Sequence, residues 1–276
     1  MTKFDVELVG KVGSMALVNK AWGDIDYNVI SRISRELVPG MIWVTSGAAE
    51  IGRLDYMKRN GGAELTGKRE EIKTDYAAQG QAILMENYRE YIDPKYSVRQ
   101  ILVEHQHFND AQKCENLRNL LLRCPKQNAI PIVNYNDPLS DDEIVKVELQ
   151  RLEQKGFKAV HCVDNDETAS QIANLVKCKK LLIYTSTLGI YANPKDPNSL
   201  ITEISGKDTY ELVDNITECQ KACDGASRNG ANGAKAKLEY IKSPVQNGTE
   251  VYIANPKFSI KEILNGDAPC TKIFVK

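Results

Sequence analysis

The sequence contains no long apolar run. None of its hydrophobic stretches approaches the roughly 20 residues that a membrane-spanning helix needs. Residues 1–20, MTKFDVELVGKVGSMALVNK, alternate polar and apolar side chains and lack the uninterrupted apolar stretch of a signal peptide. We therefore expect a soluble protein that does not contact a membrane.

An excess of charge of either sign is also absent. The chain has 36 Lys and Arg against 37 Asp and Glu, which gives a formal net charge of -1 and a pI near 6.4. This balance argues against an extended nucleic-acid-binding surface, and we expect no nucleic-acid partner. The composition, 42% hydrophobic and 26% charged, is close to the average of globular proteins, and 276 residues suffice for one large domain or two small ones.

The pattern of a disulfide framework or of a zinc site is missing as well. The seven cysteines are odd in number and follow no secretory signal, so paired disulfides are not expected and the cytoplasm is the natural compartment. Cys219 and Cys223 have the spacing of one helix face, and His105 and His107 flank one residue. These residues could ligate a metal, or they could be buried thiols and strand-end histidines. We favour the second interpretation and expect no metal-ligating residue, because no second pair has a zinc-like spacing.

What the sequence does contain is a regular alternation of strand-like and helix-like segments. We predict strands over Phe4–Val9, Met41–Thr45, Val98–Val103, Ala129–Val133, Phe157–Cys162, Leu181–Thr185, Glu250–Ala254 and Lys272–Val275. We predict helices over Ile25–Leu37, Gln106–Leu122, Asp141–Gln154, Glu167–Val176 and Ala234–Ile241. The alternation indicates βαβ units, a mostly parallel sheet and a three-layer α/β sandwich. The stretch Asn193–Ser199, rich in Pro, Asn and Asp, is the best candidate for a boundary between two lobes that share the sheet.

Ligands of such sheets collect beyond the carboxyl ends of the strands, so the loops after the predicted strands are where chemistry is expected. Gly10–Ser14 brackets Lys11 with two glycines, which suits either an anion or an ordinary solvated turn. Thr45–Ala49 offers hydroxyl and backbone donors to an anion, or it is a close-packed turn. Neither loop is a Walker A motif or a G-x-S-x-G elbow, and no histidine is suitably arranged for a catalytic triad.

Asn and Asp cluster after two further strands, in Asn134–Pro138 and Val163–Glu167. Turn and N-cap chemistry favours these residue types, but two such loops at one sheet edge suggest a polar pocket. Nearer the C-terminus, residues 229–237 (NGANGAKAK) lead into a helix with two lysines. This pattern favours phosphate binding at a helix start, or it is a simple cap before a surface helix.

Taken in order, these segments resemble the amino acid kinase family, its glutamate 5-kinase branch most closely. The matching blocks are GKVGSMAL at 10–17, VTSGAAEIGR at 44–53, YAAQGQ at 76–81, IPIVNYNDP at 130–138, DNDETASQIANLVKCKKLLIYTSTLGIYANP at 164–194 and, more weakly, NGANGAKAKLEYI at 229–241, followed by IANPKFSIKEILNG. The resemblance extends from Phe4 to Lys276. It implies a single domain over 1–276 with an open, mainly parallel eight-stranded sheet between helical layers. The acceptor would bind in an N-terminal lobe of about 1–178, and ATP in a C-terminal lobe of about 179–276.

The resemblance also implies the site residues. The catalytic residues would be Lys11, Asp166 and Lys237, with Asp166 ordering the two lysines. ATP would be bound by Lys11, Gly13, Ser14, Thr185, Ser186, Tyr191, Asn232, Gly233, Lys235 and Lys237. The acceptor would be bound by Ser46, Gly47, Ala48, Asn134, Asp137 and Asn165.

The implied activity is ATP- and Mg²⁺-dependent phosphoryl transfer to the carboxylate of a small amino acid, glutamate being the leading acceptor, in proline biosynthesis. A homo-oligomer is implied as well. A carboxylate is already ionised at pH 7 and needs no general base, so the lack of an obvious His or Cys nucleophile agrees with this chemistry. Two alternatives remain open: a kinase of the same family with another acceptor, such as a phosphate monoester, and a nucleotide- or amino-acid-sensing protein without turnover.

The chain departs from the family pattern at three places. Ser186 stands where the family usually has an aspartate of the nucleotide site. The loop at 230–237 keeps its terminal lysine but loses hydroxyls and a glycine. The segment Asp141–Gly156 is an excess that could reshape the acceptor pocket or form a solvated surface helix. We further expect these residues to comprise the kinase domain alone, without the C-terminal PUA domain of many relatives.

Overall fold

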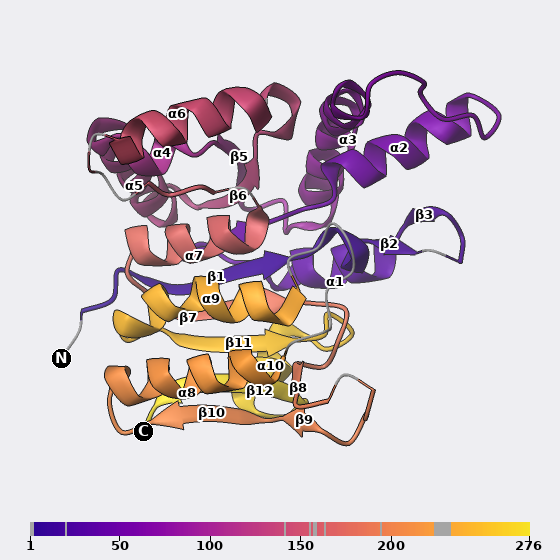
Figure 1. Ribbon diagram of the computed structural model, residues 1–276. Coiled ribbons are helices and arrows are strands. Elements are labelled where there is room, and N and C mark those ends of the chain that lie inside the picture. Colours follow the sequence, from indigo (N-terminus) through magenta and orange to yellow (C-terminus); the bar gives the residue numbers. More distant parts are fainter. Residues whose placement is uncertain are drawn as a thin grey trace.

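An open eight-stranded sheet forms the centre of the computed structural model (Figure 1). The structure describes residues 3–19, 21–140, 142–154, 156, 159–162, 164–193, 195–223 and 233–276. The strands of the sheet are β1 (Val6–Val12), β4 (Met41–Val44), β5 (Ser97–Val103), β6 (Ala129–Tyr135), β7 (Cys178–Tyr184), β10 (Glu203–Gly206), β11 (Glu250–Ala254) and β12 (Cys270–Val275). Their order is β10-β12-β11-β7-β1-β4-β6-β5. From β11 to β5 all neighbours are parallel, whereas β12 runs antiparallel to β11 and parallel to β10.

Helices cover both faces of this sheet. One face is covered by α4 (Gln106–Asn109), α5 (Ala111–Arg123), α7 (Asn165–Leu175), α8 (Thr209–Ala222) and α9 (Gly233–Gln246). The other face is covered by α1 (Tyr27–Glu36), α2 (Ala48–Arg59), α3 (Arg69–Tyr91) and α10 (Ile260–Asn265). Figure 1 shows α7, α9 and α8 lying side by side over the strands. The expected α/β fold, a three-layer sandwich with an eight-stranded, mainly parallel sheet, is therefore confirmed.

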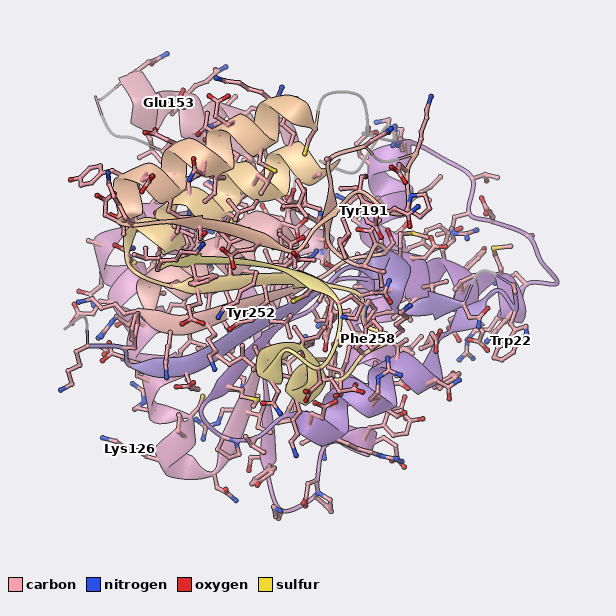
Figure 2. The ribbon with its side chains drawn as sticks, turned by 90° about the horizontal axis from the view of Figure 1, so that it is seen from below. Trp22, Lys126, Glu153, Tyr191, Tyr252 and Phe258 are labelled. Carbon is pink, nitrogen blue, oxygen red and sulfur yellow. The ribbon has the colours of Figure 1, made fainter. Side chains whose placement is uncertain are left out.

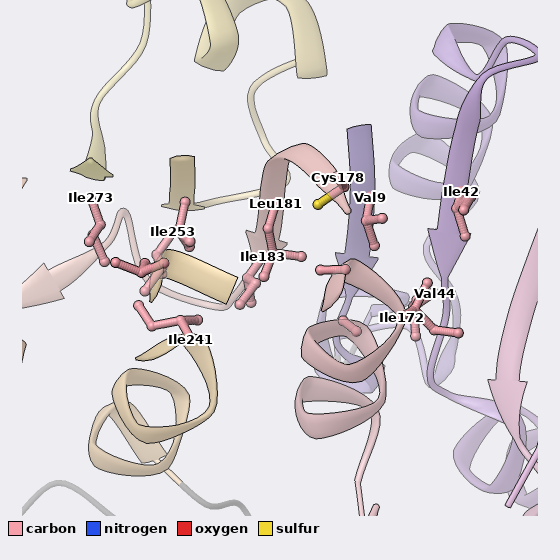
Figure 3. Close-up of a cluster of buried hydrophobic side chains, with 14 of the residues drawn as sticks. Val9, Ile42, Val44, Ile172, Cys178, Leu181, Ile183, Ile241, Ile253 and Ile273 are labelled. Carbon is pink, nitrogen blue, oxygen red and sulfur yellow. The ribbon is translucent and has the colours of Figure 1, made fainter. Parts of the chain in front are cut away.

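The strands are held by side chains that alternate between two apolar clusters. On β7, Leu181 and Ile183 join the cluster under α7 and α9, whereas Leu182 and Tyr184 join the cluster under α1 and α10. Figure 3 shows the first of these clusters between the strands and the helices. Burying one such side chain contributes about 1.5–3 kcal/mol, so a central strand with both faces apolar is strongly fixed in register.

Short hairpins and 3₁₀ turns lie outside the main sheet. The hairpins are β2 (Val18–Asn19) with β3 (Asp24–Ile25) and β8 (Ile190–Tyr191) with β9 (Leu200–Ile201), and the 3₁₀ turns are η1 (Ser14–Ala16), η2 (Pro125–Gln127) and η3 (Asp137–Leu139). The side chain of Trp22, in the turn between β2 and β3, is 75% exposed and projects from the rim of the molecule (Figure 2). No helix in the part of the chain that the structure describes is long and apolar enough to cross a membrane.

One predicted strand, Phe157–Cys162, is wrong. The described residues 159–162 are not extended in a ladder, and the backbone N–H and C=O of Val160 both bond to the side-chain amide of Asn109, at 2.8 Å each. Because this amide already pairs with the backbone groups that hydrogen bonding to a neighbouring strand would need, the segment forms an irregular loop. The eighth strand is instead β10, which shows no apolar run in the sequence because Ile204 is its one large apolar residue.

The helix predictions also need correction. The predicted helix Gln106–Leu122 is two helices, because Asp110 is extended and its side chain caps α5 by accepting from Lys113 N at 2.9 Å. Four helices were not predicted: α2, α3, α8 and α10. The first two pack against each other as well as against the sheet, so their apolar residues do not form one stripe.

Candidate active site

A polar cavity of about 530 Å³ opens at the carboxyl ends of the parallel strands. Because β1, β4, β6 and β7 point the same way, the loops that follow them meet at one edge of the sheet. The lining residues are Lys11, Gly13, Ser14, Met15, Ala16, Ser46, Gly47, Ala48, Ala49, Glu50, Lys73, Tyr135, Asp137, Asp164, Asn165, Asp166, Tyr184, Thr185, Ser186 and Lys237. The cavity thus brings together most of the residues that the sequence singled out.

Three charged side chains from three elements meet in the cavity wall. Lys11 Nζ, on β1, lies 2.6 Å from Asp166 Oδ1 as an ion pair without an aligned hydrogen bond. Lys237 Nζ, on α9, donates to Asp166 Oδ2 at 2.6 Å. The three side chains are only 7%, 9% and 15% exposed for Lys11, Asp166 and Lys237. Two buried ammonium groups therefore share one carboxylate, so the three side chains together carry one net positive charge.

The carboxylate of Asp166 stays ionised in this environment. Burial raises its pKa, but the charges of Lys11 and Lys237, together with the hydrogen bond from Lys237, outweigh burial and hold the pKa below its ordinary value. Asp166 is held by the start of α7, where Asp164 Oδ1 accepts from the backbone N–H groups of Asp166 and Glu167 at 2.8 and 2.9 Å. The cap fixes the direction in which the carboxylate points, and the carboxylate in turn fixes both ammonium groups.

Another wall of the cavity is the first turn of α2. Gly47 caps this helix with φ 103°, a left-handed conformation that favours glycine, and Ser46, Gly47 and Ala48 all line the cavity. The helix is held tightly against α3, because a Cβ on Gly52 would lie 1.8 Å from Tyr76 O and a Cβ on Gly80 would lie 1.8 Å from Ala48 O. The glycines let the two helix backbones touch, and that contact fixes the position of the cavity wall that α2 forms.

The Asn side chains of the acceptor loops form a chain of hydrogen bonds. Asn165 Nδ2 donates to Asn134 Oδ1 at 3.0 Å, and Asn134 Nδ2 donates to Gln81 Oε1 at 2.7 Å. Asn165 lines the cavity, whereas Asn134 is buried and is not part of the lining. Asn134 therefore contacts Asn165 and α3 in this structure rather than the cavity.

The nucleotide-side predictions divide in a similar way. Gly13, Ser14, Thr185 and Ser186 line the cavity next to Lys11. Tyr191, Gly233 and Lys235 are not in its lining: Tyr191 lies in the β8–β9 hairpin, visible in Figure 2, and Gly233 begins α9. Asn232 lies outside the described residues.

The structure adds cavity residues that sequence reasoning missed. Lys73, on α3, lies 3.3 Å from Asp137 Oδ1 through its Nζ atom, and both line the cavity. Glu50 and Tyr135 line it too. Lys73 stands three residues before the matched YAAQGQ block, which was the only signal that could have drawn attention to it.

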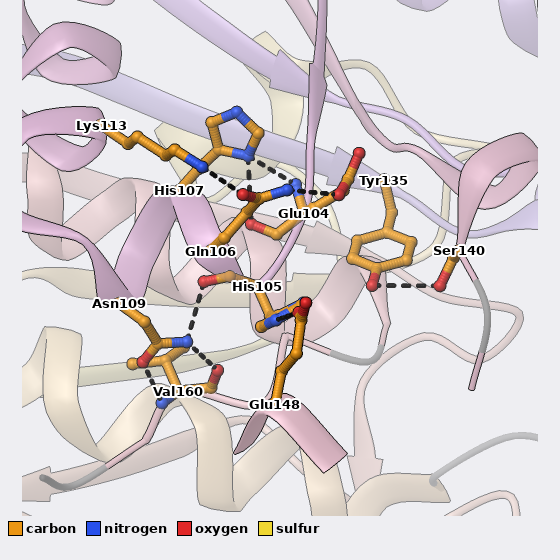
Figure 4. Close-up of polar contacts among 10 residues, drawn as sticks. All are labelled: Glu104, His105, Gln106, His107, Asn109, Lys113, Tyr135, Ser140, Glu148 and Val160. Atoms are coloured by element: carbon orange, nitrogen blue, oxygen red, sulfur yellow. Dashed lines mark hydrogen bonds and ion pairs between the residues drawn. The ribbon is translucent and has the colours of Figure 1, made fainter. Parts of the chain in front are cut away.

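A second polar network surrounds Glu104 and His105, directly after β5, and Figure 4 shows the contacts of Glu104 with Gln106 and of His105 with Glu148. Asn136 Nδ2 donates to Glu104 Oε1 at 2.7 Å, and Gln106 Nε2 donates to Glu104 Oε2 at 2.8 Å. Burial raises the pKa of Glu104, but the hydrogen bonds from Asn136 and Gln106 outweigh burial and hold the pKa below its ordinary value, so the carboxylate is ionised. Next to it, buried His105 is 2.9 Å from Glu148 Oε2 on α6 (Asp142–Gln154). No described residue of α6 lines the cavity.

The cysteines are all free thiols. Burial raises the pKa of Cys162, three residues before Asn165, to about 12, so this thiol is protonated at neutral pH and is not a nucleophile. Among the described residues there is no group of three or more His, Cys, Asp or Glu side chains that could hold a metal ion. The chemistry of the cavity therefore rests on lysines, carboxylates, amides and backbone donors.

In a comparison with known protein families, residues 8–255 match the amino acid kinase family. The chain is 30% identical over 259 residues to a glutamate 5-kinase of Streptococcus suis (strain 05ZYH33). The alignment spans 91% of this chain and 64% of that protein. It is 28% identical over 272 residues to a glutamate 5-kinase of Clostridium perfringens (strain 13 / Type A), with 94% and 92% covered.

Solved structures are similar in fold. The carbamate kinase of Giardia lamblia bound to AMP-PNP superposes with a TM-score of 0.60 at 15% identity, with 100% of each chain covered. An isopentenyl phosphate kinase superposes with a TM-score of 0.54 at 12% identity, with 98% of this chain and 100% of that chain covered. At such low identity these likenesses concern the fold alone.

Proposed function

The chain belongs to the amino acid kinase family, and we propose that it transfers the γ-phosphoryl group of ATP to the carboxylate of a small amino acid, with glutamate as the leading acceptor. The observation that carries this proposal is the buried cluster of Lys11, Asp166 and Lys237 in the wall of the polar cavity. The product would be an acyl phosphate, glutamyl 5-phosphate if the acceptor is glutamate.

The reaction needs no general base. An oxygen of the acceptor carboxylate, which is ionised at neutral pH, attacks the γ-phosphorus, the bond from that phosphorus to the β–γ bridging oxygen breaks, and ADP leaves with the electron pair. The described lining contains no histidine and no cysteine, which agrees with a step that moves no proton. What the step requires is that two negatively charged reactants be held in line and that their charge be neutralised.

Lys11 and Lys237 are placed for that neutralisation. Each ammonium is oriented by Asp166, so neither has to be reorganised when charge spreads over the phosphoryl oxygens. Asp166 is already an ion-pair partner of two cations and has a lowered pKa, so its role would be to position the lysines rather than to accept a proton. Backbone donors at Gly13 and Ser14, which line the same part of the cavity, would contact the nucleotide phosphates.

The described residues fit a magnesium ion that arrives with the nucleotide. Mg²⁺ is typically held by phosphate oxygens, water and only one or two carboxylates, and the cavity offers Asp164 beside Asp166 but no cluster of three or more acidic or imidazole ligands among the described residues. When bound, the ion would neutralise charge on the transferred phosphates. Asp164 already caps α7, so it would contact the ion through its second oxygen or through water.

One observation favours a rival function. Ser186 lines the cavity at a position where related chains usually carry an aspartate, and its loss could weaken nucleotide binding in a sensing protein without turnover. The intact cluster of Lys11, Asp166 and Lys237 argues for catalysis, because a sensor has no need to hold two ammonium groups toward a phosphoryl position.

A screen of ADP release tests the proposal. The purified protein is incubated with ATP and Mg²⁺ and with one acceptor at a time from three classes: amino acids, simple carboxylic acids and phosphate monoesters. We expect acceptor-dependent ADP release with an amino acid that carries a second carboxylate, glutamate first. ADP release only with a phosphate monoester would show that the acceptor is a phosphate monoester and not a carboxylate. Nucleotide binding without ADP release in every class would favour the sensing protein.

A further inference from the structure

A second cavity lies next to the polar cavity described above, on the side of α1. Its volume is about 420 Å³, and three of its lining residues, Met15, Ala16 and Ser186, are shared with the larger cavity. Its other walls are the first two turns of α1 and the turn after β11, residues 255–257. The cluster of two lysines and one aspartate is not part of its lining, so the proposed phosphoryl transfer does not account for it.

The side chain of Arg32, on α1, lies in the wall of this second cavity. Two of its nitrogens, Nε and Nη2, are buried and have no hydrogen-bond partner among the described residues. A buried donor without an acceptor costs about 1–3 kcal/mol, and more when the group is charged. A negatively charged acceptor that enters the cavity would remove this cost.

Two carboxylates lie close enough to feel the charge of Arg32, but both are bonded elsewhere. Glu36 Oε2 accepts from the backbone N–H of Lys261 at 3.1 Å. Glu262 Oε2 accepts from the backbone N–H of Ser259 at 2.8 Å. Burial raises the pKa of Glu36 and the hydrogen bonds of Ser259 lower the pKa of Glu262, while the charge of Arg32 adds a smaller lowering effect on both. The two carboxylates thus serve the start of α10 and leave the guanidinium nitrogens without an acceptor.

The rest of the lining defines which ligand fits. Lys257, an exposed residue, adds a second positive charge, and Asp26, which caps α1 by accepting from Val29 N at 3.1 Å, adds one negative charge. With Arg32, the charged lining residues therefore carry one net positive charge. Most of the other lining side chains are apolar: Met15, Ala16, Val18, Val29 and Pro256. The lining matches a ligand that carries one negative charge on a compact apolar body.

The turn after β11, which forms one wall, is held in place by the protein itself. Asn255 Nδ2 donates to Ser186 O at 3.0 Å, and Tyr184 OH donates to Phe258 O at 2.9 Å. A wall that is formed before the ligand arrives lowers the ordering cost of binding.

We propose that this cavity binds a small monocarboxylate with an apolar body, whose carboxylate accepts hydrogen bonds from the guanidinium of Arg32. A guanidinium presents its N–H groups in a planar fork that matches the two oxygens of a carboxylate. A phosphate group fits less well, because its charge of about -2 would face Asp26, Glu36 and Glu262. The site is distinct from the acceptor site of the proposed phosphoryl transfer and does not depend on that reaction.

Calorimetric titration with benzoate tests the proposal against three comparison ligands. Benzamide keeps the shape without the charge, acetate keeps the charge without the apolar body, and inorganic phosphate carries more charge. We expect benzoate to bind the wild-type protein at least about tenfold more tightly than each of the three. Arg32→Gln should weaken the binding of benzoate by about 10- to 100-fold and leave that of benzamide unchanged. Lys257→Gln should weaken the binding of benzoate by a smaller factor, because Lys257 is exposed.

Two further variants serve as controls. Arg35→Gln is the matched one, because Arg35 is exposed on the same helix and does not line the cavity. Lys237→Ala separates the two cavities, since a carboxylate held by the lysines of the larger cavity would lose affinity in that variant. Both should bind benzoate as the wild type does, with or without AMP-PNP.

Four results would overturn the proposal: benzoate that binds no more tightly than benzamide, benzoate that Arg32→Gln leaves unaffected, benzoate that is lost in Lys237→Ala, and benzoate that AMP-PNP displaces. The last would show that the cavity belongs to the nucleotide site. If the urea transition shows that Arg32→Gln does not fold, Lys257→Gln and the comparison of the four ligands decide in its place.

Discussion

At the scale of single residues, the account depends on one carboxylate that serves two cations. Asp166 holds Lys11 and Lys237 within 2.6 Å each, in a setting where all three side chains are buried. A buried pair of this kind is poor evidence for stability, because desolvation offsets most of the attraction. Its value here is geometric: both ammonium groups are aimed before substrate arrives.

Removing one of these ammonium groups should damage catalysis and not the fold. We expect Lys237→Ala, and equally Lys11→Ala, to lower kcat by on the order of a hundredfold or more, since one charged transition-state contact is worth about 3–4 kcal/mol. The measurement is steady-state ADP release at saturating ATP. Lys242→Ala is the control on the same helix, because Lys242 pairs with Glu239 away from the cavity. A Lys237→Ala protein with the turnover of the wild type would remove Lys237 from the site.

Asp166 also predicts a definite dependence of stability on pH. Its pKa is lower in the folded than in the unfolded chain, because Lys11 and Lys237 overcome the effect of burial. Its contribution is therefore fully present above the unfolded pKa of about 3.9 and is lost as the pH falls through the folded value. Asp166→Asn should lower the free energy of unfolding at pH 7 by about 3 kcal/mol, since two buried ammonium groups lose their partner.

Urea denaturation at a series of pH values measures this effect. The difference between wild type and Asp166→Asn should shrink as the pH is lowered below about 4, because the carboxyl of the unfolded wild-type chain then takes up a proton while the folded one stays ionised. A difference that is constant from pH 7 to pH 3 would show that the variant loses packing and not an ion pair. The pH–rate profile of the residual activity should lack a basic limb, since the acceptor has no proton to give up.

At the scale of elements, the crossing of α2 and α3 fixes the position of the cavity wall that α2 forms. Gly80→Ala should destabilise the protein by about 1–3 kcal/mol, because the new Cβ would stand 1.8 Å from Ala48 O and must push the helices apart. At an exposed helix position the same change would stabilise the protein by about 1 kcal/mol, so the sign of the stability change shows whether the two helices are in contact at Gly80. We also expect a higher KM for the acceptor with little change in the KM for ATP. Thermal or urea unfolding and acceptor titrations measure both, with Thr74→Ala on the same helix as control, and a stabilised Gly80→Ala protein would contradict this packing.

The helix α6 is expected to affect the choice of acceptor less than its position between two cavity loops of the chain suggests. None of its described residues lines the cavity, and its contact with the body includes buried Leu149 and the pair of Glu148 with His105. Replacing residues 141–156 by a tight turn should therefore leave the choice among acceptors unchanged, because Asn136 and Glu104 hold the acceptor loop independently. The screen of ADP release, repeated on the shortened protein, checks this, and a new order of preferred acceptors would show that α6 shapes the pocket.

Elements differ in how far the sequence predicts them. Seven predicted strands coincide with strands of the sheet. Central strands such as β7 and β11 carry apolar runs buried on both faces, whereas the outer strands β5 and β12 are only partly buried. Phe157–Cys162 has the same appearance in sequence, yet the side chain of Asn109 takes the backbone bonds of Val160. Helices α2 and α3 were not predicted because their glycines, which usually signal a turn, serve a helix contact that only the tertiary structure reveals.

The site was predictable where a residue follows its own strand. Lys11 comes at the end of β1, and Asp166 opens α7 after a loop rich in Asn and Asp, so the local pattern drew attention to both loops and the family resemblance singled out the two residues. Lys73 and Gln81 reach the end of β6 and the turn after it from within α3, and nothing local distinguishes them from other polar residues on this helix. That Tyr191, Lys235 and Asn232 contact ATP stays a prediction.

At the scale of the whole molecule, one continuous sheet runs under both sides of the cavity. β1 pairs with β4 on one side, where we propose that the acceptor binds, and with β7 on the other, where we propose that ATP binds, and Lys11 lies at the carboxyl end of β1 between them. A reaction between two substrates at this edge needs no domain to close in order to bring Lys11, Asp166 and Lys237 together. The division into lobes near residue 178 and the homo-oligomer stay predictions.

The most direct test of the central claim is to trap the product with hydroxylamine. An acyl phosphate reacts with hydroxylamine to give a hydroxamate, whereas a phosphate monoester or free phosphate does not. With ATP, Mg²⁺ and glutamate, the account predicts one hydroxamate for each ADP in the wild-type protein and a loss of both by on the order of a hundredfold in Lys237→Ala. ADP formed without hydroxamate, or hydroxamate formed equally by the variant, would contradict phosphoryl transfer to a carboxylate at this site.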